Sequence, residues 1–202
     1  MDSRVIAERV LQLARAASSD GLVEGLTPAQ WSVLRYLARA NRFSRTPSAF
    51  AAFHGTTRGT VSQTIKNLEA QGYLARVRSE ADGRSVRLDL TDKARAILVS
   101  DLFEVLVRAA DALPPGVRGN FGNALERLLG QVAWERGKPV LGTCASCKHL
   151  QCDGCCHEGQ AAFACGLANA ALLPEELGEL CIYCAPGKPM AMKGAVTGVA
   201  SR

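Results

Sequence analysis

The residues best suited to chemistry in this 202-residue chain are its eight cysteines, none of which precedes Cys144. Six of them lie in the stretch CASCKHLQCDGCCHEGQAAFAC, which ends at Cys165. The N-terminal stretch MDSRVIAERVLQLARAA carries charges throughout and lacks the apolar segment of a secretory signal, so we expect a cytoplasmic protein. Because the cytosol keeps thiols reduced, clustered cysteines predict a metal centre there rather than a disulfide framework.

Several sets of four cysteines have spacings that are typical of metal centres. Cys144, Cys147, Cys165 and Cys181 resemble the layout of high-potential iron–sulfur proteins, in which one CxxC pair and two separate cysteines enclose a [4Fe–4S] cluster. We favour this set. The apolar residues expected to wrap the cluster are Phe163, Leu167, Leu172, Leu173 and Leu177.

Two other metal centres fit the same stretch. Cys147, Cys152 and Cys155 with a distant fourth ligand match the plant-type [2Fe–2S] spacing. CxxC pairs, 144/147 with either 152/155 or 181/184, match a structural zinc site with four thiolates. Cys156 and Cys184 are interpreted as spare thiols, and His149 and His157 as possible substitute ligands.

The elements before the cysteines predict a mainly α fold with a small β-hairpin. Residues 4–17 place apolar side chains at helical spacing, and TPAQWSVLRYLARA opens with Thr27 as N-cap, Pro28 at the first helical position and Gln30 completing a capping box. The stretch TPSAFAAF repeats the Thr-Pro start, HGTT ends it, and a further helix follows Thr57. Two helices joined by a tight glycine-containing turn predict a helix-turn-helix.

The following residues predict a hairpin and two long helices. YLARVRSE and SVRLDLT alternate apolar with polar residues around the turn ADGR, with Ala75 and Val77 on one strand and Val86, Leu88 and Leu90 on the other. Thr91 caps a long helix that continues to about residue 109 and stops before Pro114-Pro115. The inward residues of a final helix, about 116–136, are expected to be Phe121, Leu125, Leu128, Leu129 and Val132.

A helix-turn-helix followed by a hairpin is a winged helix, and TTRGTVSQTIKNLEAQGYLAR with ADGRSVRLDLT resembles the recognition helix and wing of the MarR family of bacterial transcription factors. The resemblance covers about residues 4–137 in element order and is sharpest across 46–98. Ala94 departs from the glycine that often follows the LT cap in this family. Family members are homodimers built by their terminal helices, which implies double-stranded DNA with two half-sites about one helical turn apart.

The resemblance and the chemistry of the helix after Thr57 together predict the DNA-contacting residues. Ser62 and Gln63 are expected to read base edges in the major groove, because short polar side chains and glutamine suit that task. Thr57 and Arg58 lie at the helix N-terminus, where a phosphate is favoured, and Lys66 adds a second phosphate contact. The family's wing implies that Arg84 enters the minor groove and that Asp82 orients it. The predicted set is Thr57, Arg58, Thr60, Ser62, Gln63, Lys66, Asp82 and Arg84.

Charge and composition place these functions in different parts of the chain. The first 140 residues carry 20 Lys and Arg against 14 Asp and Glu, whereas residues 141–202 carry 4 against 5, so a polyanion belongs to the first part. We expect a winged-helix DNA-binding and dimerisation domain at 1–140, a metal module at 141–185 and a disordered tail at 186–202. No stretch is apolar enough to span a membrane.

These observations favour a sequence-specific DNA-binding regulator, expected to be a repressor, whose DNA affinity depends on a [4Fe–4S] cluster that senses iron, oxygen or redox state. Small cysteine modules of this kind are also attached to some MarR-like regulators. One alternative is a MarR-like repressor that answers to a small aromatic effector and carries a structural zinc module. Another is an iron–sulfur electron-transfer protein. Without a nucleotide-binding loop or a Ser-His-Asp-like constellation in the sequence, we do not expect an enzyme.

Overall fold

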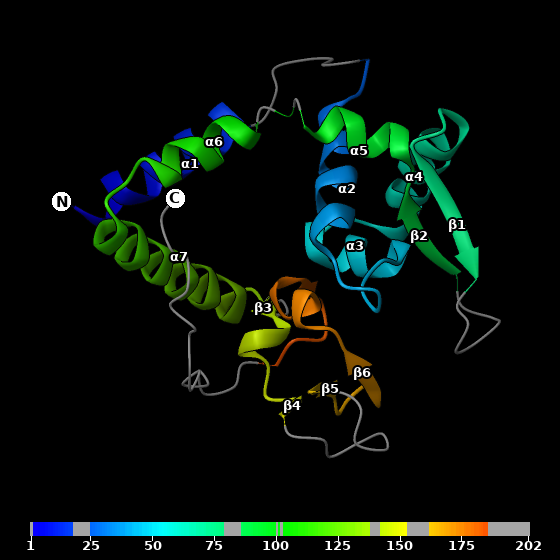
Figure 1. Ribbon diagram of the computed structural model, residues 1–202. Coiled ribbons are helices and arrows are strands. Elements are labelled where there is room, and N and C mark those ends of the chain that lie inside the picture. The colour runs from blue at the N-terminus through cyan, green and yellow to red at the C-terminus, as the bar shows by residue number, and fades with distance from the viewer. Residues whose placement is uncertain are drawn as a thin grey trace, which may run out of the picture. The chain divides into compact units, whose positions relative to one another are not determined.

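The computed structural model describes residues 2–17, 25–78, 86–99, 101, 103–137, 142–152 and 162–185. The chain divides into two units, Met1–Val140 and Leu141–Arg202 (Figure 1). The first unit is helical apart from one hairpin, and the second contains short strands and 3₁₀ turns. None of the helices in the described ranges is long and apolar enough to cross a membrane.

The core of the first unit is formed by α2 (Pro28–Arg39), α3 (Pro47–His54), α4 (Arg58–Ala70) and the hairpin that follows them. Thr27, Thr46 and Thr57 each accept a hydrogen bond from a first-turn amide of the helix that they precede, so all three helices begin where the sequence predicts. Gly55 ends α3 with a φ of 66°, a left-handed conformation that suits glycine. The largest fully buried apolar side chains of this core are Leu26, Trp31, Val33, Leu34, Leu37, Val61, Ile65, Leu68 and Leu88.

The hairpin consists of β1 (Leu74–Arg78) and β2 (Val86–Leu90), paired antiparallel with Leu74 opposite Leu90 and Arg76 opposite Leu88. Residues opposite each other in such a pair share one face of the sheet. Leu74, Leu88 and Leu90 therefore make the buried face, and Ala75 and Val77 lie on the other, exposed face. The prediction that Ala75 and Val77 supply the apolar face of β1 was wrong, because the register places Leu74 there instead.

The long helix predicted after Thr91 is two helices in the structure, α5 (Asp92–Leu98) and α6 (Phe103–Asp111). Between them Asp101 is 5% exposed and accepts hydrogen bonds from Nε and Nη2 of Arg35 on α2. The same carboxylate accepts a 3.1 Å hydrogen bond from the amide of Phe103, which starts α6. This ion pair holds Asp101 in the core. If a single helix continued through residue 101, the Phe103 amide would lose the hydrogen bond by which Asp101 caps α6.

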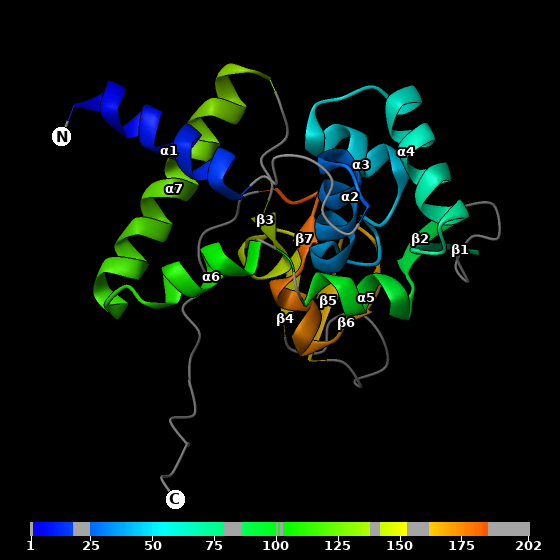
Figure 2. The same ribbon diagram turned by 90° about the horizontal axis from the view of Figure 1, so that it is seen from above.

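Figure 2 shows the remaining helices of the first unit, α1 (Ser3–Ala17), α6 and α7 (Pro115–Glu135). None of the three contains a buried residue. The residues predicted to point inward on α7 were not found buried: Phe121, Leu128, Leu129 and Val132 are 43%, 40%, 67% and 45% exposed. Within one chain these helices have no core to bury them. Their apolar faces are available to another molecule.

The second unit contains two small antiparallel sheets (Figure 1). β3 (Gly142–Thr143) pairs with β7 (Leu180–Cys181), and β4 (Leu150–Cys152), β5 (Phe163–Cys165) and β6 (Ala170–Leu172) form the other sheet in that order. Two 3₁₀ turns, η1 (Cys144–Ser146) and η2 (Pro174–Gly178), follow β3 and β6. Of the five residues predicted to wrap a cluster, Leu172 and Leu177 are buried and Phe163 is half-buried, whereas Leu167 and Leu173 are each 56% exposed.

Candidate functional site

The outer face of α4 is the candidate surface for binding a polyanion. Val61, Ile65 and Leu68 are buried, which fixes the rotation of the helix about its axis. The opposite face presents Gln63 and Lys66, and Arg58, the first residue of the helix, is exposed as well. The helix is therefore anchored by one apolar stripe and offers a polar face with one cation, next to a second cation at its N-terminus.

The small hydroxyl residues of α4 make hydrogen bonds within the helix. Thr57 Oγ1 accepts from the Thr60 amide at 3.3 Å and lies 3.0 Å from Thr60 Oγ1, so both threonines serve the start of the helix. Ser62 Oγ donates to the Arg58 carbonyl at 2.8 Å and is half-buried. Its donor is occupied, which leaves the hydroxyl as an acceptor for an outside partner.

Gln63 is the more accessible of the two predicted base readers. Its Nε2 donates to Oδ1 of Asn67 at 3.1 Å, one turn further along the exposed face. Sequence reasoning missed Asn67, although its spacing of four residues from Gln63 places it on the same face. Two adjacent amides offer both donors and acceptors, as adenine recognition in the major groove requires.

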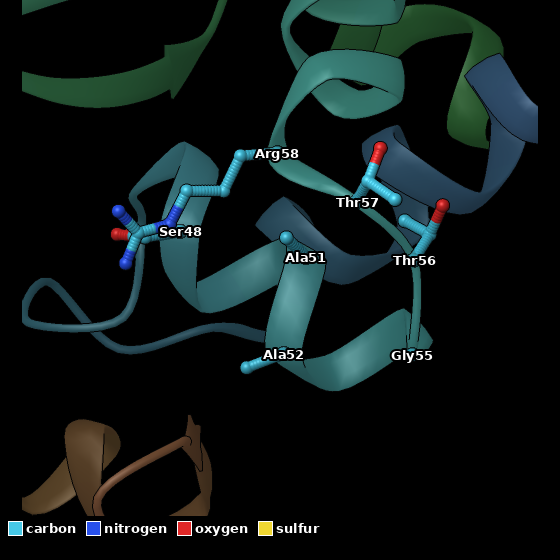
Figure 3. A pocket seen from close by; sticks show the side chains of 7 residues that line it. All are labelled: Ser48, Ala51, Ala52, Gly55, Thr56, Thr57 and Arg58. Atoms are coloured by element: carbon cyan, nitrogen blue, oxygen red, sulfur yellow. The ribbon is translucent and has the colours of Figure 1, made fainter.

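A cavity of about 540 Å³ lies beside the start of α4. Figure 3 shows the residues that line it: Ser48, Ala51, Ala52, Gly55, Thr56, Thr57 and Arg58. Small side chains from α3 leave the first turn of α4 accessible, and Arg58 contributes a cation at its edge. Such a hollow accommodates the bulk of a phosphate backbone next to the amides of a helix N-terminus.

The wing carries further positive charge at its base. Asp89 on β2 accepts from Arg87 Nη2 at 2.9 Å and from Arg45 Nη1 at 3.4 Å, so one carboxylate serves two guanidinium groups. Arg76 on β1 is paired with Glu69 of α4, and this hydrogen bond raises the pKa of Arg76.

Arg45 was not predicted as part of the site. Asp82 and Arg84 at the tip of the wing lie outside the described residues.

In the second unit, two CxxC turns have the same backbone hydrogen bond. The Cys147 amide donates to the Cys144 carbonyl at 3.1 Å, and the Cys184 amide donates to the Cys181 carbonyl at 3.2 Å. β3 and β7 join these turns, because Gly142 pairs with Cys181 and Thr143 with Leu180. The structure thus brings Cys144, Cys147 and Cys181 of the predicted ligand set into one place.

Cys184, which was interpreted as a spare thiol, lies within this group. Burial, followed by the neighbouring Cys147 and Cys181, raises the pKa of the Cys184 thiol to about 12. Its Sγ lies 3.6 Å from the Thr143 carbonyl oxygen and faces Gly142 closely. Cys144 and Cys181 are buried, whereas Cys147 and Cys184 are half-buried.

Cys165, the remaining predicted ligand, is on β5 of the three-stranded sheet, opposite Leu150 of β4 and Ala170 of β6. Cys152 lies on β4 opposite Phe163. The six cysteines that the structure describes are free thiols, and Cys155 and Cys156 lie outside the described residues. In the described parts of the chain, no group of three or more His, Cys, Asp or Glu side chains has the arrangement of a metal site.

Comparison with known proteins gives matches to the first unit. Residues 24–85 match the model of the MarR family, whereas no curated protein matches the chain. The fold is similar to that of CouR from Rhodococcus jostii RHA1 bound to p-coumaroyl-CoA, with a TM-score of 0.51 and 20% identity over 63% of this chain and 91% of that one.

Two further solved structures are similar to the chain. The S. aureus MepR–DNA complex has a TM-score of 0.51 and 18% identity over 65% of this chain and 96% of that one. The transcriptional regulator SlyA has a TM-score of 0.50 and 22% identity over 66% and 99%. At these identities the likeness establishes the winged-helix fold.

Proposed function

We propose, from the premise that this chain carries the winged helix of a MarR-family transcriptional regulator, that it binds double-stranded DNA through α4 and the β1–β2 wing. The observation that carries the proposal is the outer face of α4, where Gln63 and Lys66 are exposed opposite a buried stripe, together with exposed Arg58 at the start of the helix. An α-helix fits the major groove of B-DNA. There an amide side chain can bond to a base edge, while the cations near it contact phosphates of the backbone. MepR, a relative in fold, is described in complex with DNA.

Within this proposal the roles on α4 differ from residue to residue. Gln63, together with Asn67, reads bases, because both amides are exposed and their mutual hydrogen bond leaves the Gln63 oxygen and the Asn67 nitrogen for outside partners. Arg58 and Lys66 contact phosphates, and Thr57 and Thr60 hold the helix start whose amides face the DNA. Ser62 contributes as an acceptor. Arg84 at the wing, oriented by Asp82, is proposed to enter the minor groove.

The exposed apolar faces of α1, α6 and α7 support a homodimer. Leu11 is 57% exposed, Leu129 67% and Trp134 81%, and these helices bury none of their residues within one chain. Large apolar side chains exposed on three helices are characteristic of a protein–protein interface. Two copies would present two α4 helices to half-sites about 34–36 Å apart, so the operator is expected to be pseudo-palindromic.

Substitution of Gln63, the amide proposed to read bases, tests the DNA contact. DNA selected from a random-sequence pool by the wild-type protein is used as the probe in fluorescence anisotropy. Gln63→Ala is expected to weaken binding by about 1–3 kcal/mol, or roughly 5- to 150-fold, and to relax preference at one or two base pairs.

The matched control is Gln131→Ala on α7. Gln131 is also exposed and donates from Nε2 to a residue four positions on, Glu135, at 2.8 Å. Its removal should leave DNA affinity unchanged. Equal affinities for Gln63→Ala, Arg58→Ala and the wild type would rule out docking through α4.

We propose further that the cysteine module binds metal and that its loading alters DNA affinity. The support is the pairing of two CxxC turns, which places thiols where a metal can cross-link two ends of the module. The expected centre is a [4Fe–4S] cluster that senses iron, oxygen or redox state, with zinc or [2Fe–2S] as alternatives. When bound, the metal would supply cross-links that the short strands of this unit otherwise lack.

Metal removal tests this second proposal. The full chain is purified without oxygen, its metal content and visible absorption are measured, and DNA affinity is compared before and after chelation. Because the module follows the last helix of the first unit, loss of metal is expected to change DNA affinity by at least about fivefold, since allosteric coupling is typically about 1–3 kcal/mol. Identical DNA affinities with and without metal would show that the module does not regulate DNA binding.

A further inference from the structure

The two CxxC turns of the second unit are joined by hydrogen bonds on both sides. Ahead of the first turn, Gly142 and Thr143 pair with Cys181 and Leu180. Beyond both turns, the Lys148 amide donates to the Ala185 carbonyl at 2.9 Å. Backbone bonds therefore hold residues 142–148 against residues 180–185 at two places, and the CxxC turns lie between them.

The side chain of Cys184 is packed into the first turn. A Cβ built on Gly142 would lie 2.6 Å from Cys184 Sγ and 3.3 Å from Ser146 Oγ, so only glycine leaves room for that sulfur. The Cys147 thiol is a near enough neighbour of Cys184 to interact with it. The second thiols of the two turns are thus neighbours.

The first cysteines of the two turns are the more buried pair, with Cys144 5% and Cys181 7% exposed. Each belongs to the same backbone turn as its partner, since the 3.1 Å and 3.2 Å amide bonds close both CxxC loops. The paired turns thus contribute two buried and two half-buried thiols. Cys165 comes instead from the other sheet, where it is the last residue of β5 and lies opposite Leu150 of β4 and Ala170 of β6.

We propose that Cys144, Cys147, Cys181 and Cys184 together form a four-thiolate site for a single divalent cation, zinc or ferrous iron. This inference rests on the proposed metal module and selects, among the ligand sets that the spacing allows, the CxxC pairs 144/147 and 181/184, so that Cys184 replaces Cys165 and one ion replaces the cluster. Since the described thiols do not yet have metal-site geometry, binding would rotate side chains about Cα–Cβ on a backbone already in place. At the zinc–sulfur distance of about 2.3 Å, tetrahedral thiolates lie roughly 3.8 Å apart, close to thiol contact distance.

Thiol protection tests this ligand set without any substitution. The full-length chain is loaded anaerobically with Zn²⁺ alone, freed of excess metal, treated with N-ethylmaleimide and mapped by mass spectrometry. Cys144, Cys147, Cys181 and Cys184 are expected to resist alkylation until a chelator is added, while Cys152 and Cys165 react before chelation. Protection of Cys165 in place of Cys184 would overturn the inference.

Serine variants give an independent measure. With Co²⁺ as a spectroscopic probe, Cys184→Ser and Cys181→Ser are expected to lose the thiolate-to-cobalt absorption of a four-sulfur site and to bind at least about tenfold more weakly. Cys165→Ser and Cys152→Ser, the matched controls, should keep both. Loss with Cys165→Ser and retention with Cys184→Ser would contradict the proposed set.

The same measurements separate this inference from the proposals on which it rests. If the wild type binds no Zn²⁺, Co²⁺ or iron, the metal module itself fails together with the inference. If metal binds through Cys165, the module stands and only the ligand set fails. DNA affinity measured on the same samples reports on α4 independently of either result.

Discussion

At the scale of single residues, the contacts of a candidate side chain decide its role more than its residue type does. Ser62 and Gln63 were predicted as equal base readers, but Ser62 donates to the Arg58 carbonyl and Gln63 is paired with Asn67. Cys184 was predicted to be spare and instead is a neighbour of Cys147. For Ser62 and Gln63 the partner lies four residues away in the same helix, whereas for Cys184 it comes from the other CxxC turn.

Gly142 provides a residue-scale prediction about the cysteine group. Gly142→Ala places a methyl group 2.6 Å from Cys184 Sγ, so the sulfur must leave the position that it has in the structure. We expect the variant to retain less Zn²⁺ in a competition with a colorimetric chelator, with the retained fraction falling by at least about threefold, since overpacking of this kind typically costs about 1–3 kcal/mol.

The control for this substitution is Gly178→Ala in the same unit. A Cβ at Gly178 meets nothing within 4 Å, and the residue has no left-handed φ. It should therefore retain metal like the wild type. A Gly142→Ala protein that also retains metal normally would show that Cys184 is not held where the structure places it.

At the scale of elements, the ion pair between Arg35 and Asp101 connects three helices. Arg35 lies on α2, its Nη1 donates to the Ala17 carbonyl at the end of α1, and Asp101 caps α6. The guanidinium also lies 5.8 Å from the ring centroids of both Trp31 and Phe103. One arginine thus joins the winged helix to the helices with exposed apolar faces.

Removing Arg35 should therefore be costly. Arg35→Met leaves the carboxylate of Asp101, whose side chain is 3% exposed, without its partner. Breaking a buried pair from one side typically costs about 3–5 kcal/mol, and because Arg35 itself is 24% exposed we expect roughly 2–3 kcal/mol. Urea unfolding followed by circular dichroism measures the change in the free energy of unfolding.

A surface ion pair of the same kind supplies the comparison. Arg118 and Asp111 are 2.8 Å apart, but their side chains are 48% and 65% exposed. Arg118→Met should change the free energy of unfolding by less than about 1 kcal/mol, because exposed pairs contribute little. Equal effects of the two substitutions would mean that the Arg35 pair is not the link between these helices.

At the scale of the whole molecule, DNA binding by this fold depends on the proposed second copy. Leu129→Asp introduces a charge into the apolar face of α7, where Leu129 is 67% exposed. We expect the variant to elute and scatter light as a monomer, because a charge without a partner is expensive to bury in an interface. Affinity for a two-half-site operator should fall with it, since one copy contacts only one half-site.

Val99→Asp tests whether an exposed apolar residue in general has this effect. Val99 follows α5, lies outside α1, α6 and α7, and is 79% exposed. The variant should keep the mass and the DNA affinity of the wild type. A monomeric wild-type protein, or a dimeric Leu129→Asp variant, would place the subunit contact elsewhere.

The sequence by itself determined the features that depend on hydrogen bonds between near neighbours. Thr27, Thr46, Thr57 and Thr91 each cap a helix, and the winged helix built from these helices matches the MarR family as the recognition-helix motif indicated. Such caps join residues only three positions apart, so a short stretch of sequence contains both partners.

Only the tertiary structure decided the features whose partners are distant in the chain. The break between α5 and α6 requires Arg35, which is 66 positions from Asp101, and the face of β1 that is buried depends on register with β2. The place of Cys184 depends on Gly142 and Cys147 across the β3–β7 pair. Spacing along the chain does not encode which distant residues meet, because that follows from packing and strand register in the folded molecule.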